Sequence, residues 1–393
     1  MIRIALITPL FPTLAEPYQG TTMYHAAATL RAWARVEVWR TRAVYPSARM
    51  FQPKTFQIDA DLTARDLPGV PLHYVDYPVF PVLSRPINGK AVEHRLLPRI
   101  AQERPDVLLG YWIYPEGYAA VRIGRKLDIP VVLGSLGSDL LKITDPFTRR
   151  GVVAAVRGAD GIIGVSADLT RQAVAFGAPA DRAWTVPNGC NRSIFYRRNR
   201  AASRDNLGIQ RDAKVVLFVG WIAALKGVPE LLEAVAQLER VQLVCIGDGP
   251  LRGQLEARSG ESDLRGRVRF MGRQNAQAVS EWLAAADLLC LPSYSEGCPN
   301  VVVEALSSGR AVVATRVGGI PELVNEKVGI LIPPGDVPAL AAALRAALER
   351  RWDEEAIERT ARRSWEDMGA EIWHRIAALL PNTVESACPK PKS

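Results

Sequence analysis

Glu296 and Glu304 are eight residues apart, and their surroundings suggest a ligand site. They lie in Ala286–Glu322, which reads ADLLCLPSYSEGCPNVVVEALSSGRAVVATRVGGIPE. Its apolar residues predict a buried strand that ends at Pro292 and a helix that begins around Pro299. Such a helix presents free backbone N–H groups, which bind phosphate. Carboxylates beside a phosphate are unfavourable unless they bind hydroxyl groups, so this pair points to a sugar or a ribose.

Two further segments follow predicted strands. Lys226 comes after an apolar strand and a short loop, in VGWIAALKG, where a flexible cation can meet phosphate. A structural lysine is less favoured near a helix start, because its charge opposes the helix dipole. Gly247-Asp248-Gly249-Pro250 also follows a strand and opens a helix. This turn borders a nucleobase or is a plain strand–helix turn, and the sequence leaves both open.

No metal site is predicted. The four histidines are dispersed, and the five cysteines are an odd number without CxxC spacing. This pattern argues against a zinc site or a disulfide framework and favours a reducing cytosol. Asp59-Ala60-Asp61 has the DxD spacing of metal-dependent transferases, but it is predicted to be a solvated turn.

Apolar runs bounded by glycine and proline alternate with amphipathic stretches along the chain, which predicts βαβ units and parallel sheets. The expected strands are Arg3–Thr8, Val36–Trp39, Pro71–Val75, Val107–Gly110, Pro130–Gly134, Gly161–Ser166, Lys214–Gly220, Val241–Gly247, Val268–Met271, Ala286–Leu291, Ala311–Ala314 and Gly329–Ile332. The expected helices are Thr22–Trp33, Gly117–Leu127, Ala167–Phe176, Val228–Leu238, Pro250–Ala257, Ala276–Ala285, Val301–Ser308, Val337–Glu349 and Trp365–Leu380. The charged segment Tyr196–Asn206 lacks apolar periodicity and is predicted to be a linker between two Rossmann-like halves.

Composition narrows the class of protein. A chain of 393 residues exceeds the usual size of one core, and 48% hydrophobic residues are ordinary for a globular protein. No stretch without Asp, Glu, Lys or Arg exceeds 14 residues, whereas a membrane-spanning helix needs about 20 mostly apolar residues. The N-terminus is predicted to be a first strand rather than a cleavable signal. The net charge of +8 is spread along the chain, which disfavours nucleic acid and fits phosphorylated small molecules or an anionic membrane.

The region Asp76–Pro105 mixes apolar and basic side chains, which suits docking on an anionic bilayer. The alternative is a helix whose apolar face joins the core, and Pro98 is predicted to interrupt any long amphipathic helix here. The residues concerned are Tyr77, Phe80, Val82, Leu83, Leu96 and Leu97 beside Arg85, Lys90, Arg95 and Arg99.

Taken together, these motifs resemble glycosyltransferase family 4, the retaining GT-B enzymes that use nucleotide-sugars. Besides the segment with the two glutamates, the resemblance is carried by ITPLFP, YPEGYAAVRIGRKLDIPVVLGSLGSDL, ADGIIGVSADLTRQAV, VPNGCNRSIF, VGWIAALKGVPELLEAV, CIGDGP and SWEDMGAEIW. It implies an α/β fold of two facing Rossmann-like domains with parallel sheets. Residues 1–198 would form the acceptor-binding domain, and residues 199–364 the nucleotide-sugar-binding domain. Residues 365–380 would cross back onto the first domain as a helix, and residues 381–393 would be a flexible tail.

The resemblance also assigns roles to residues. Glu304 would bind the ribose hydroxyls, Glu296 the hydroxyls of the transferred sugar, and Lys226 the diphosphate. The other expected donor contacts are the backbone of Gly297, Cys298, Asn300 and Val301, and Gly20, a glycine whose backbone approaches the donor phosphates.

The chain departs from the family pattern at three places. Trp221 stands where the family usually has an arginine or another polar residue, and Leu136 where it often has His or Arg. Leu109-Gly110-Tyr111-Trp112 replaces a segment that often carries a histidine. Without a histidine at these places, the polar candidates in the first domain are Asp139, Tyr111 and Glu116. Asp139 is predicted to be catalytic together with Glu296 and Lys226. Tyr111 and Glu116 are predicted to lie in the acceptor region. Either the departing phosphate accepts the acceptor's proton, or efficient catalysis has been lost.

The leading hypothesis is a retaining, metal-independent hexosyltransferase. It would move a sugar from a nucleoside diphosphate sugar, with no further cofactor, to a glycan or lipid-linked saccharide in cell-surface polysaccharide or glycolipid biosynthesis. The alternative is a non-catalytic nucleotide-sugar-binding subunit, suggested by Trp221 and Leu136. The expected location is the cytoplasm, with peripheral binding to the inner face of the plasma membrane as an option. A dinucleotide-dependent oxidoreductase is disfavoured, because no GxGxxG follows the first strand.

Overall fold

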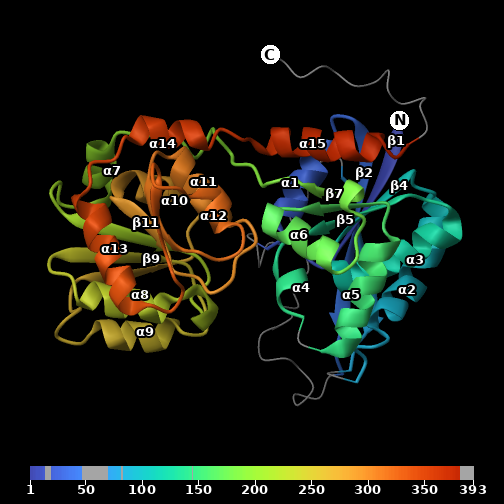
Figure 1. Ribbon diagram of the computed structural model, residues 1–393, viewed down its shortest axis with the longest axis horizontal. Coiled ribbons are helices and arrows are strands. Elements are labelled where there is room, and N and C mark those ends of the chain that lie inside the picture. The colour runs from blue at the N-terminus through green and yellow to red at the C-terminus, as the bar shows by residue number, and fades with distance from the viewer. Residues whose placement is uncertain (14–18, 47–69, 81–82, 144, 381–393) are drawn as a thin grey trace. The chain divides into compact units, whose positions relative to one another are not determined.

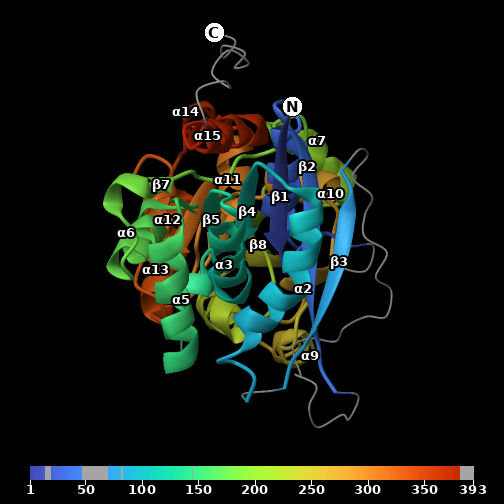
Figure 2. The ribbon, with the colours of Figure 1, turned by 90° about the vertical axis from the view of Figure 1, so that its right-hand side faces the viewer.

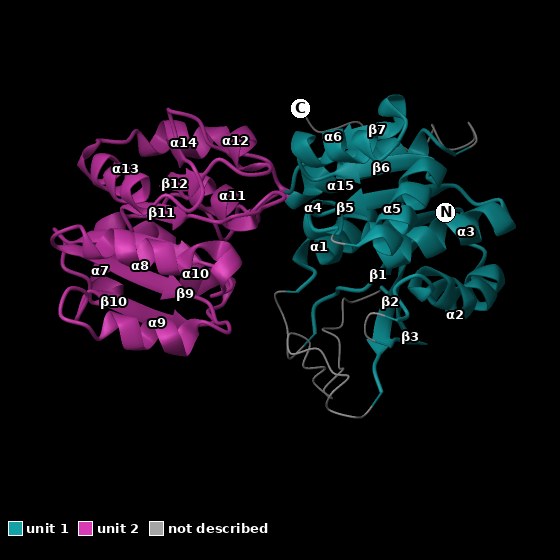
Figure 3. Cartoon of the chain, turned by 60° about the horizontal axis from the view of Figure 1, so that its bottom comes forward, with its two compact units in different colours: residues 1–188, 365–393 teal, residues 189–364 magenta. Residues whose placement is uncertain are grey.

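The computed structural model describes residues 1–13, 19–46, 70–80, 83–143 and 145–380. The chain divides into two compact units, which Figure 3 shows in different colours. Unit 1 comprises Met1–Asn188 with Trp365–Ser393, and unit 2 comprises Gly189–Ser364. The expected DxD segment at Asp59–Asp61 and the expected tail at residues 381–393 lie outside the described residues.

Unit 1 contains a parallel sheet of seven strands in the order β3-β2-β1-β4-β5-β6-β7. The order changes direction between β1 and β4, which places a topological switch point at their carboxyl ends. Helices α2, α3 and α5 cover one face of the sheet (Figure 2). The strands are β1 (Ile2–Thr8), β2 (Ala34–Val44), β3 (Leu72–Pro78), β4 (Val107–Tyr111), β5 (Val131–Ser135), β6 (Gly161–Gly164) and β7 (Ala183–Thr185). The helices are α1 (Thr21–Leu30), α2 (Asn88–Glu103), η2 (Ile113–Gly117), α3 (Tyr118–Leu127), α4 (Ser138–Leu141), α5 (Pro146–Gly158), α6 (Ala167–Ala175), η3 (Ala180–Arg182) and α15 (Trp365–Ala377).

Helix α15 packs along α1 on the other face of this sheet (Figure 1). The Trp365 ring stacks on His25 with centroids 4.2 Å apart, and Trp373 stacks on Trp33 at 6.2 Å. Gly369 lies so close to Thr29 that a Cβ there would come within 2.2 Å of its hydroxyl oxygen. The prediction that the last helix returns to the first domain is therefore confirmed.

Unit 2 contains a parallel sheet of six strands in the order β10-β9-β8-β11-β12-β13, with its switch point between β8 and β11. The strands are β8 (Lys214–Val219), β9 (Val241–Ile246), β10 (Val268–Gly272), β11 (Leu288–Leu291), β12 (Ala311–Thr315) and β13 (Gly329–Ile332). The helices are α7 (Arg200–Leu207), η4 (Ala224–Lys226), α8 (Val228–Ala236), α9 (Arg252–Ser259), α10 (Ala276–Ala285), α11 (Asn300–Ser307), α12 (Ile320–Leu323), α13 (Val337–Glu349) and α14 (Glu354–Thr360). The predicted α/β fold with two parallel sheets is confirmed.

The segment predicted to be a linker, Tyr196–Asn206, is for the most part helix α7. Asn199 caps this helix by accepting a hydrogen bond from the backbone N–H of Ala202 at 3.1 Å. Arg204 is only 3% exposed, because its guanidinium donates to the carbonyl of Ala285 and to the carboxylate of Asp287. The linker prediction was wrong because buried charges, rather than apolar residues, hold this helix in place.

The structure divides the chain after Asn188, earlier than the predicted boundary after residue 198. The reason is that residues just beyond Gly189 pack within unit 2. The backbone N–H of Cys190 donates to the carbonyl of Arg363 at 3.0 Å, and the Ser280 hydroxyl donates to the carbonyl of Ile194 at 2.6 Å.

Pro98 does not interrupt a helix, contrary to the prediction. It lies inside α2, on the exposed side, while Leu96 and Ile100 on the opposite side are fully buried. The hydrogen bond that proline forfeits would have gone to the carbonyl of His94, which is also exposed. The buried face therefore holds the helix across the proline.

Candidate active site

The candidate donor site lies at the carboxyl ends of β8 and β11 in unit 2, where open α/β sheets bind ligands. The loop after β8 contacts the loop after β11, because the backbone N–H of Tyr294 donates to the carbonyl of Leu225 at 2.9 Å. Gly227 ends the first loop with a φ of 66°, and a Cβ there would lie 2.1 Å from the carbonyl oxygen of Pro292. Glycine is thus required for the two loops to approach, and this approach places Lys226.

Lys226 and Glu296 form an ion pair, with 2.5 Å between Nζ and Oε1. The same carboxylate oxygen accepts a hydrogen bond from the Ser293 hydroxyl at 2.6 Å, and Thr315 donates to the carbonyl of Ser293. Glu296 is buried, whereas the Lys226 side chain is 24% exposed. The carboxylate is therefore fixed by protein donors, and the Lys226 side chain is partly exposed, so that it can meet an anionic ligand.

The segment Val317-Gly318-Gly319 holds the backbone of the loop that carries Glu296. The N–H of Gly319 donates to the carbonyl of Gly297 at 3.0 Å. Gly318 has a φ of 50°, and a Cβ there would collide with the carbonyl oxygen of Glu296 at 1.7 Å. Two segments that resemble family motifs are therefore in contact, and the glycine segment fixes the backbone of the Glu296 loop.

Helix α11 begins at Asn300, with Pro299 at its N-cap, as the sequence predicts to within one residue. Cys298 before it is buried. Glu304 lies one turn inside the helix and is part-buried, and no hydrogen bond to its carboxylate is found among the described residues. Burial raises the pKa of Glu304 to about 7. A carboxylate that lacks a protein donor is suited to accept hydrogen bonds from ligand hydroxyls.

The turn at Gly247-Asp248-Gly249 packs against the loop after β8. A Cβ at Gly247 would lie 1.9 Å from the carbonyl oxygen of Gly220, and one at Gly249 would lie 2.3 Å from that of Ile222. The Asp248 carboxylate accepts a hydrogen bond from the N–H of Gly249 at 2.8 Å. Packing thus accounts for both glycines, and contact with a nucleobase stays a prediction.

Gly20 caps α1 in unit 1, at the loop that follows β1. Its φ is 74°, and a Cβ there would lie 2.6 Å from the carbonyl oxygen of Leu10. This close backbone approach requires glycine at the carboxyl end of β1. The predicted contact of Gly20 with donor phosphates is compatible with this position.

Asp139 organises its own loop. One carboxylate oxygen accepts hydrogen bonds from the Ser135 hydroxyl at 3.1 Å and from the N–H groups of Leu136 at 3.2 Å and Gly137 at 2.9 Å. The other accepts from the N–H of Ile113 at 3.4 Å. Burial raises the pKa of Asp139, although these donors oppose that effect. The structure thus shows a positioning residue, and a role in catalysis stays a prediction.

Tyr111 is the last residue of β4, and Glu116 lies in η2 just after this strand. Both side chains are buried. The Tyr111 ring lies against Gly134, where a Cβ would come within 2.3 Å of it. Glu116 accepts a hydrogen bond from the Thr41 hydroxyl at 2.7 Å, while its second oxygen has no partner among the described residues. Burial raises the pKa of Glu116 to about 7. Both residues are therefore buried at the carboxyl edge of the first sheet.

Sequence reasoning missed Ser293 as a support for Glu296, although its place three residues before the glutamate in the same loop was a signal. Trp221, at one of the three departures, is half exposed, and Leu136 packs on the core of unit 1. Among the described residues, no group of three His, Cys, Asp or Glu side chains could hold a metal ion.

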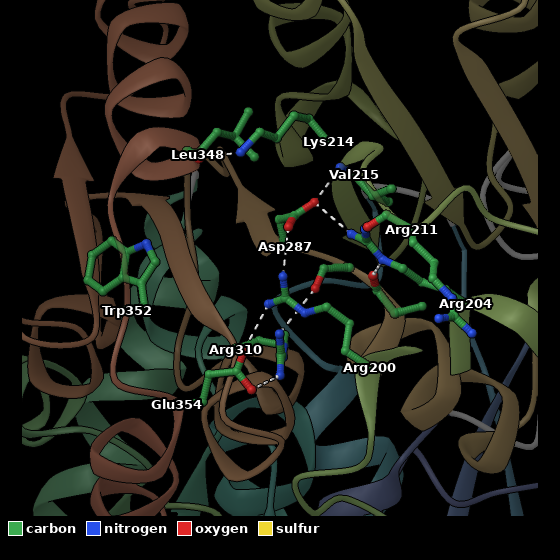
Figure 4. Close-up of polar contacts among 12 residues, drawn as sticks. Arg200, Arg204, Arg211, Lys214, Val215, Asp287, Arg310, Leu348, Trp352 and Glu354 are labelled. Atoms are coloured by element: carbon green, nitrogen blue, oxygen red, sulfur yellow. Dashed lines mark hydrogen bonds and ion pairs between the residues drawn. The ribbon is translucent and has the colours of Figure 1, made fainter. Parts of the chain in front are cut away.

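The amino end of the second sheet holds a dense network of charges that the sequence did not reveal (Figure 4). Asp287 accepts hydrogen bonds from Arg200 at 2.8 Å and Arg204 at 2.9 Å, and Glu354 accepts from Arg200 at 2.8 Å and Arg310 at 2.5 Å. All of these residues except Arg204 line a cavity of about 440 Å³, and another cavity of about 700 Å³ borders β13. Neither cavity includes Lys226, Glu296 or Glu304.

Comparisons with known proteins match two successive regions of the chain, in agreement with its division into two units. Residues 19–193 match the model described as Glycosyltransferase Family 4, and residues 213–350 match that of Glycosyl transferases group 1. A D-inositol 3-phosphate glycosyltransferase of Geodermatophilus obscurus is 32% identical over 347 residues, which cover 80% of this chain and 75% of that protein. TuaC of Bacillus subtilis, named for teichuronic acid biosynthesis, is 32% identical over 262 residues, which cover 65% of this chain and 64% of TuaC.

Solved structures share the fold. The HepE protein of Anabaena, crystallised in complex with UDP, superposes with a TM-score of 0.74 at 20% identity, over 96% of this chain and 100% of that chain. Sucrose-phosphate synthase of Thermosynechococcus elongatus also gives a TM-score of 0.74, at 21% identity, over 96% of this chain and 99% of that chain. The two sheets, the returning C-terminal helix and the sequence matches lead to one conclusion. This chain belongs to glycosyltransferase family 4, the retaining glycosyltransferases with the GT-B fold.

Proposed function

We propose that this glycosyltransferase moves a hexosyl unit from a UDP-sugar to a glycan or lipid-linked saccharide in the biosynthesis of a cell-surface polysaccharide or glycolipid. The observation that supports the donor site is the Lys226–Glu296 pair at the switch point of the second sheet, with Glu304 in helix α11 that follows the Glu296 loop. The relative named for teichuronic acid biosynthesis and the HepE complexes with UDP and UDP-glucose support the substrate class.

Lys226 and Glu296 exchange partners in this proposal. In the free protein, the lysine neutralises a buried carboxylate. When the donor binds, Lys226 turns to the diphosphate, and Glu296 accepts hydrogen bonds from hydroxyls of the transferred sugar. Lys226 then opposes the negative charge that grows on the leaving diphosphate, and such preorganised electrostatic stabilisation contributes strongly to catalysis.

The transfer itself needs no histidine base. The bond between the anomeric carbon and the diphosphate oxygen breaks, and the acceptor oxygen bonds to that carbon on the same face. The acceptor's proton passes to the departing phosphate, so the charges balance without an imidazole. This accounts for a chain with neither histidine nor arginine at the departures Tyr111, Leu136 and Trp221.

A donor screen tests this proposal. UDP, GDP, ADP and their sugars are each added to the purified protein, and the thermal midpoint Tm is measured, since a ligand of the folded state raises Tm. We expect UDP and one UDP-hexose to give the largest rise and this UDP-hexose to be hydrolysed or transferred. If no nucleotide raises Tm and none is turned over, the proposal fails. Activity that is lost on chelation and restored by magnesium or manganese would refute metal independence.

The second candidate is a subunit that binds nucleotide-sugar without catalysis. Trp221 favours it, because an indole cannot replace the charge of a guanidinium at the diphosphate. The two candidates differ in one measurement. A non-catalytic subunit raises its Tm with UDP-sugar but neither hydrolyses nor transfers it, even with a cell membrane extract as a source of acceptor.

We also propose reversible docking of unit 1 on an anionic membrane. Four large apolar side chains near Arg85 are exposed. Arg85 forms an ion pair with Asp145, the N-cap of α5, with 3.4 Å between Nη1 and Oδ2. This pair connects the loop before α2 to α5, so that the four side chains come from neighbouring segments. They are Leu83, which is 82% exposed, and Phe80, Ile87 and Phe147, each about half exposed. The described helices include none that is long and apolar enough to cross a membrane.

Sedimentation with anionic and neutral liposomes at low and high salt tests this docking. Wild type is expected to sediment with anionic liposomes at low salt and to be released by high salt, because salt screens the attraction. Leu83→Asp is expected to stay in the supernatant, whereas Val174→Asp, at an exposed apolar residue of α6, behaves as wild type. Equal recovery of wild type with and without anionic liposomes would end the idea.

A further inference from the structure

Arg40 lies in β2 at the carboxyl end of the first sheet. It is paired in register with Thr8, the last residue of β1. The hydroxyl of Thr8 bonds to the backbone of Leu10, and Leu10 touches Gly20. Arg40 therefore lies next to the strand that borders the switch point, on the edge where this fold binds ligands.

The residues that the structure describes satisfy the guanidinium of Arg40 only in part. Its Nε and Nη1 are buried and have no hydrogen-bond partner in the part of the chain that the structure describes. Burial lowers the pKa of Arg40, but an arginine keeps its proton at neutral pH. A buried charge without a partner costs free energy. An anionic ligand could supply the hydrogen-bond acceptors that these two nitrogens lack among the described residues.

Arg42, two residues further along and on the same side of the strand, shows what a satisfied arginine looks like here. Its Nε and Nη2 donate to the two oxygens of Asp76 at 2.7 and 2.5 Å. Its guanidinium also lies over the ring of Tyr74, 5.8 Å from the centroid. The carboxylate of this neighbourhood thus serves Arg42, while Tyr74 supplies Arg40 with a side-chain hydrogen bond but with no compensating charge.

We propose that Arg40 binds an anionic group, a phosphate or a carboxylate, carried by the acceptor saccharide. This inference rests on the proposed transferase function and deepens it, because it selects charged acceptors over neutral ones. The donor's diphosphate already has a cation, Lys226 in unit 2, whereas Arg40 belongs to the other unit. A site whose buried polar group stays unpaired rejects ligands that lack the matching group, since the unpaired group is costly.

The experiment uses the full chain with saturating UDP, so that the donor site is occupied. Glucose 1-phosphate, glucuronate and glucose are the probes, and their binding is measured by saturation-transfer NMR and calorimetry. We expect the wild type to bind at least one of the two anionic sugars and to bind glucose much more weakly. The two anionic probes tell a phosphate-bearing acceptor from a carboxylate-bearing one.

Arg40→Gln is expected to weaken binding of the anionic sugar by at least about tenfold, the loss typical of a charge-assisted hydrogen bond. Arg40→Lys, which keeps the charge, is expected to lose less. Arg42→Gln is the matched control and is expected to bind the probe as wild type does. The proposal is overturned if neither anionic sugar binds, if Arg40→Gln binds as wild type, or if Arg42→Gln loses as much.

Two more readouts separate this proposal from the proposed function and from a structural role. UDP affinity without probe is expected to be the same in Arg40→Gln and wild type, and a loss there would place Arg40 at the donor and overturn the proposal. The bound anionic sugar is expected to raise the Tm of wild type but not of Arg40→Gln. A large fall in the Tm of unliganded Arg40→Gln would make Arg40 structural and also overturn it. If UDP-sugar is not turned over but the anion results hold, the transferase proposal alone fails.

Discussion

The two ends of the sheet in unit 2 carry charges that are satisfied in opposite ways. At the amino end, Asp287 and Glu354 bind three arginines, and one of these, Arg310, is fully buried (Figure 4). At the carboxyl end, the described residues give Lys226 one carboxylate partner and Glu304 no hydrogen bond, and the Lys226 side chain is partly exposed. The first end is closed by its own contacts, and the second leaves charge available to a ligand.

This difference offers a test of which charges in one domain are structural and which bind a ligand. A closed network ties elements together, as Arg204 and Arg200 tie α7 to the residue before β11. Charges that are desolvated without full compensation, as at the carboxyl end, lower stability. A ligand that pairs with them offsets this loss on binding. Substitutions at the two ends are therefore expected to affect different measurements.

The largest effect is expected from Asp287→Ala. It removes the acceptor of Arg200, Arg204 and the N–H of Val215, which leaves buried Arg204 without its charge partner. We expect the free energy of unfolding of unit 2 to fall by about 3–5 kcal/mol, the typical cost of breaking a buried ion pair. Urea denaturation measures this. Asp205→Ala, which breaks an exposed pair with Arg211, is the control and is expected to change stability little. Similar losses in both variants would show that the network is not structural.

Lys226→Ala tests the other end. It is expected to weaken UDP binding roughly ten- to a hundredfold and to lower turnover, because a charge-assisted contact with the diphosphate is lost. Calorimetry and transfer rates measure these effects, and Lys327→Ala, at an exposed lysine of the same unit, is the control. Unchanged UDP affinity in Lys226→Ala would contradict our assignment of the diphosphate contact.

Glu304→Ala and Glu296→Ala divide the open end into two roles. Glu304→Ala is expected to weaken UDP and UDP-sugar alike, by about tenfold, because both ligands carry the ribose. Glu296→Ala is expected to leave UDP affinity nearly unchanged and to lower kcat, since its contact with the sugar tightens toward the transition state. The reverse pattern, with Glu296→Ala losing UDP and Glu304→Ala keeping it, would invert the proposed donor orientation.

The smallest expected effect is a pH dependence. Since the pKa of Glu304 is raised to about 7, its carboxyl is mostly protonated at pH 6 and mostly ionised at pH 8. The ionised form accepts hydrogen bonds more strongly, so UDP affinity is expected to rise about three- to tenfold over this range. Glu304→Gln cannot titrate, and any slope that remains in it belongs to UDP itself. Calorimetry at four pH values measures the difference, and equal slopes in both proteins would refute a role for this ionisation.

Most elements were predictable because their signals are local. The helices Ala276–Ala285 and Val337–Glu349 and the strand Gly329–Ile332 match the prediction residue for residue, since apolar periodicity and flanking turn residues define them. Helices α5 and α7 were not predicted. The N-cap of α5, Asp145, accepts hydrogen bonds from the N–H groups of Phe147 and Thr148, and the charged α7 depends on residues far away in the chain.

The candidate site was predictable in its residue types but not in its contacts. The sequence placed Lys226, Glu296 and Glu304 at one sheet edge, because strand–loop–helix units bring the carboxyl ends of parallel strands together. It did not show that Lys226 pairs with Glu296, that Ser293 fixes this carboxylate, or that Asp139 caps its own loop.

By itself, then, the sequence determined the α/β fold with two parallel sheets, the edge of the sheet that carries the candidate site, and the family. Only the tertiary structure decided which charges are paired. Arg40 and Arg42 look alike in the sequence, yet among the described residues only Arg42 meets a carboxylate, that of Asp76 in the neighbouring strand β3. The physical reason is range. Helix and strand signals lie within a few neighbouring residues, whereas an ion pair such as Lys226–Glu296 joins residues 70 positions apart and depends on strand order, register and loop packing.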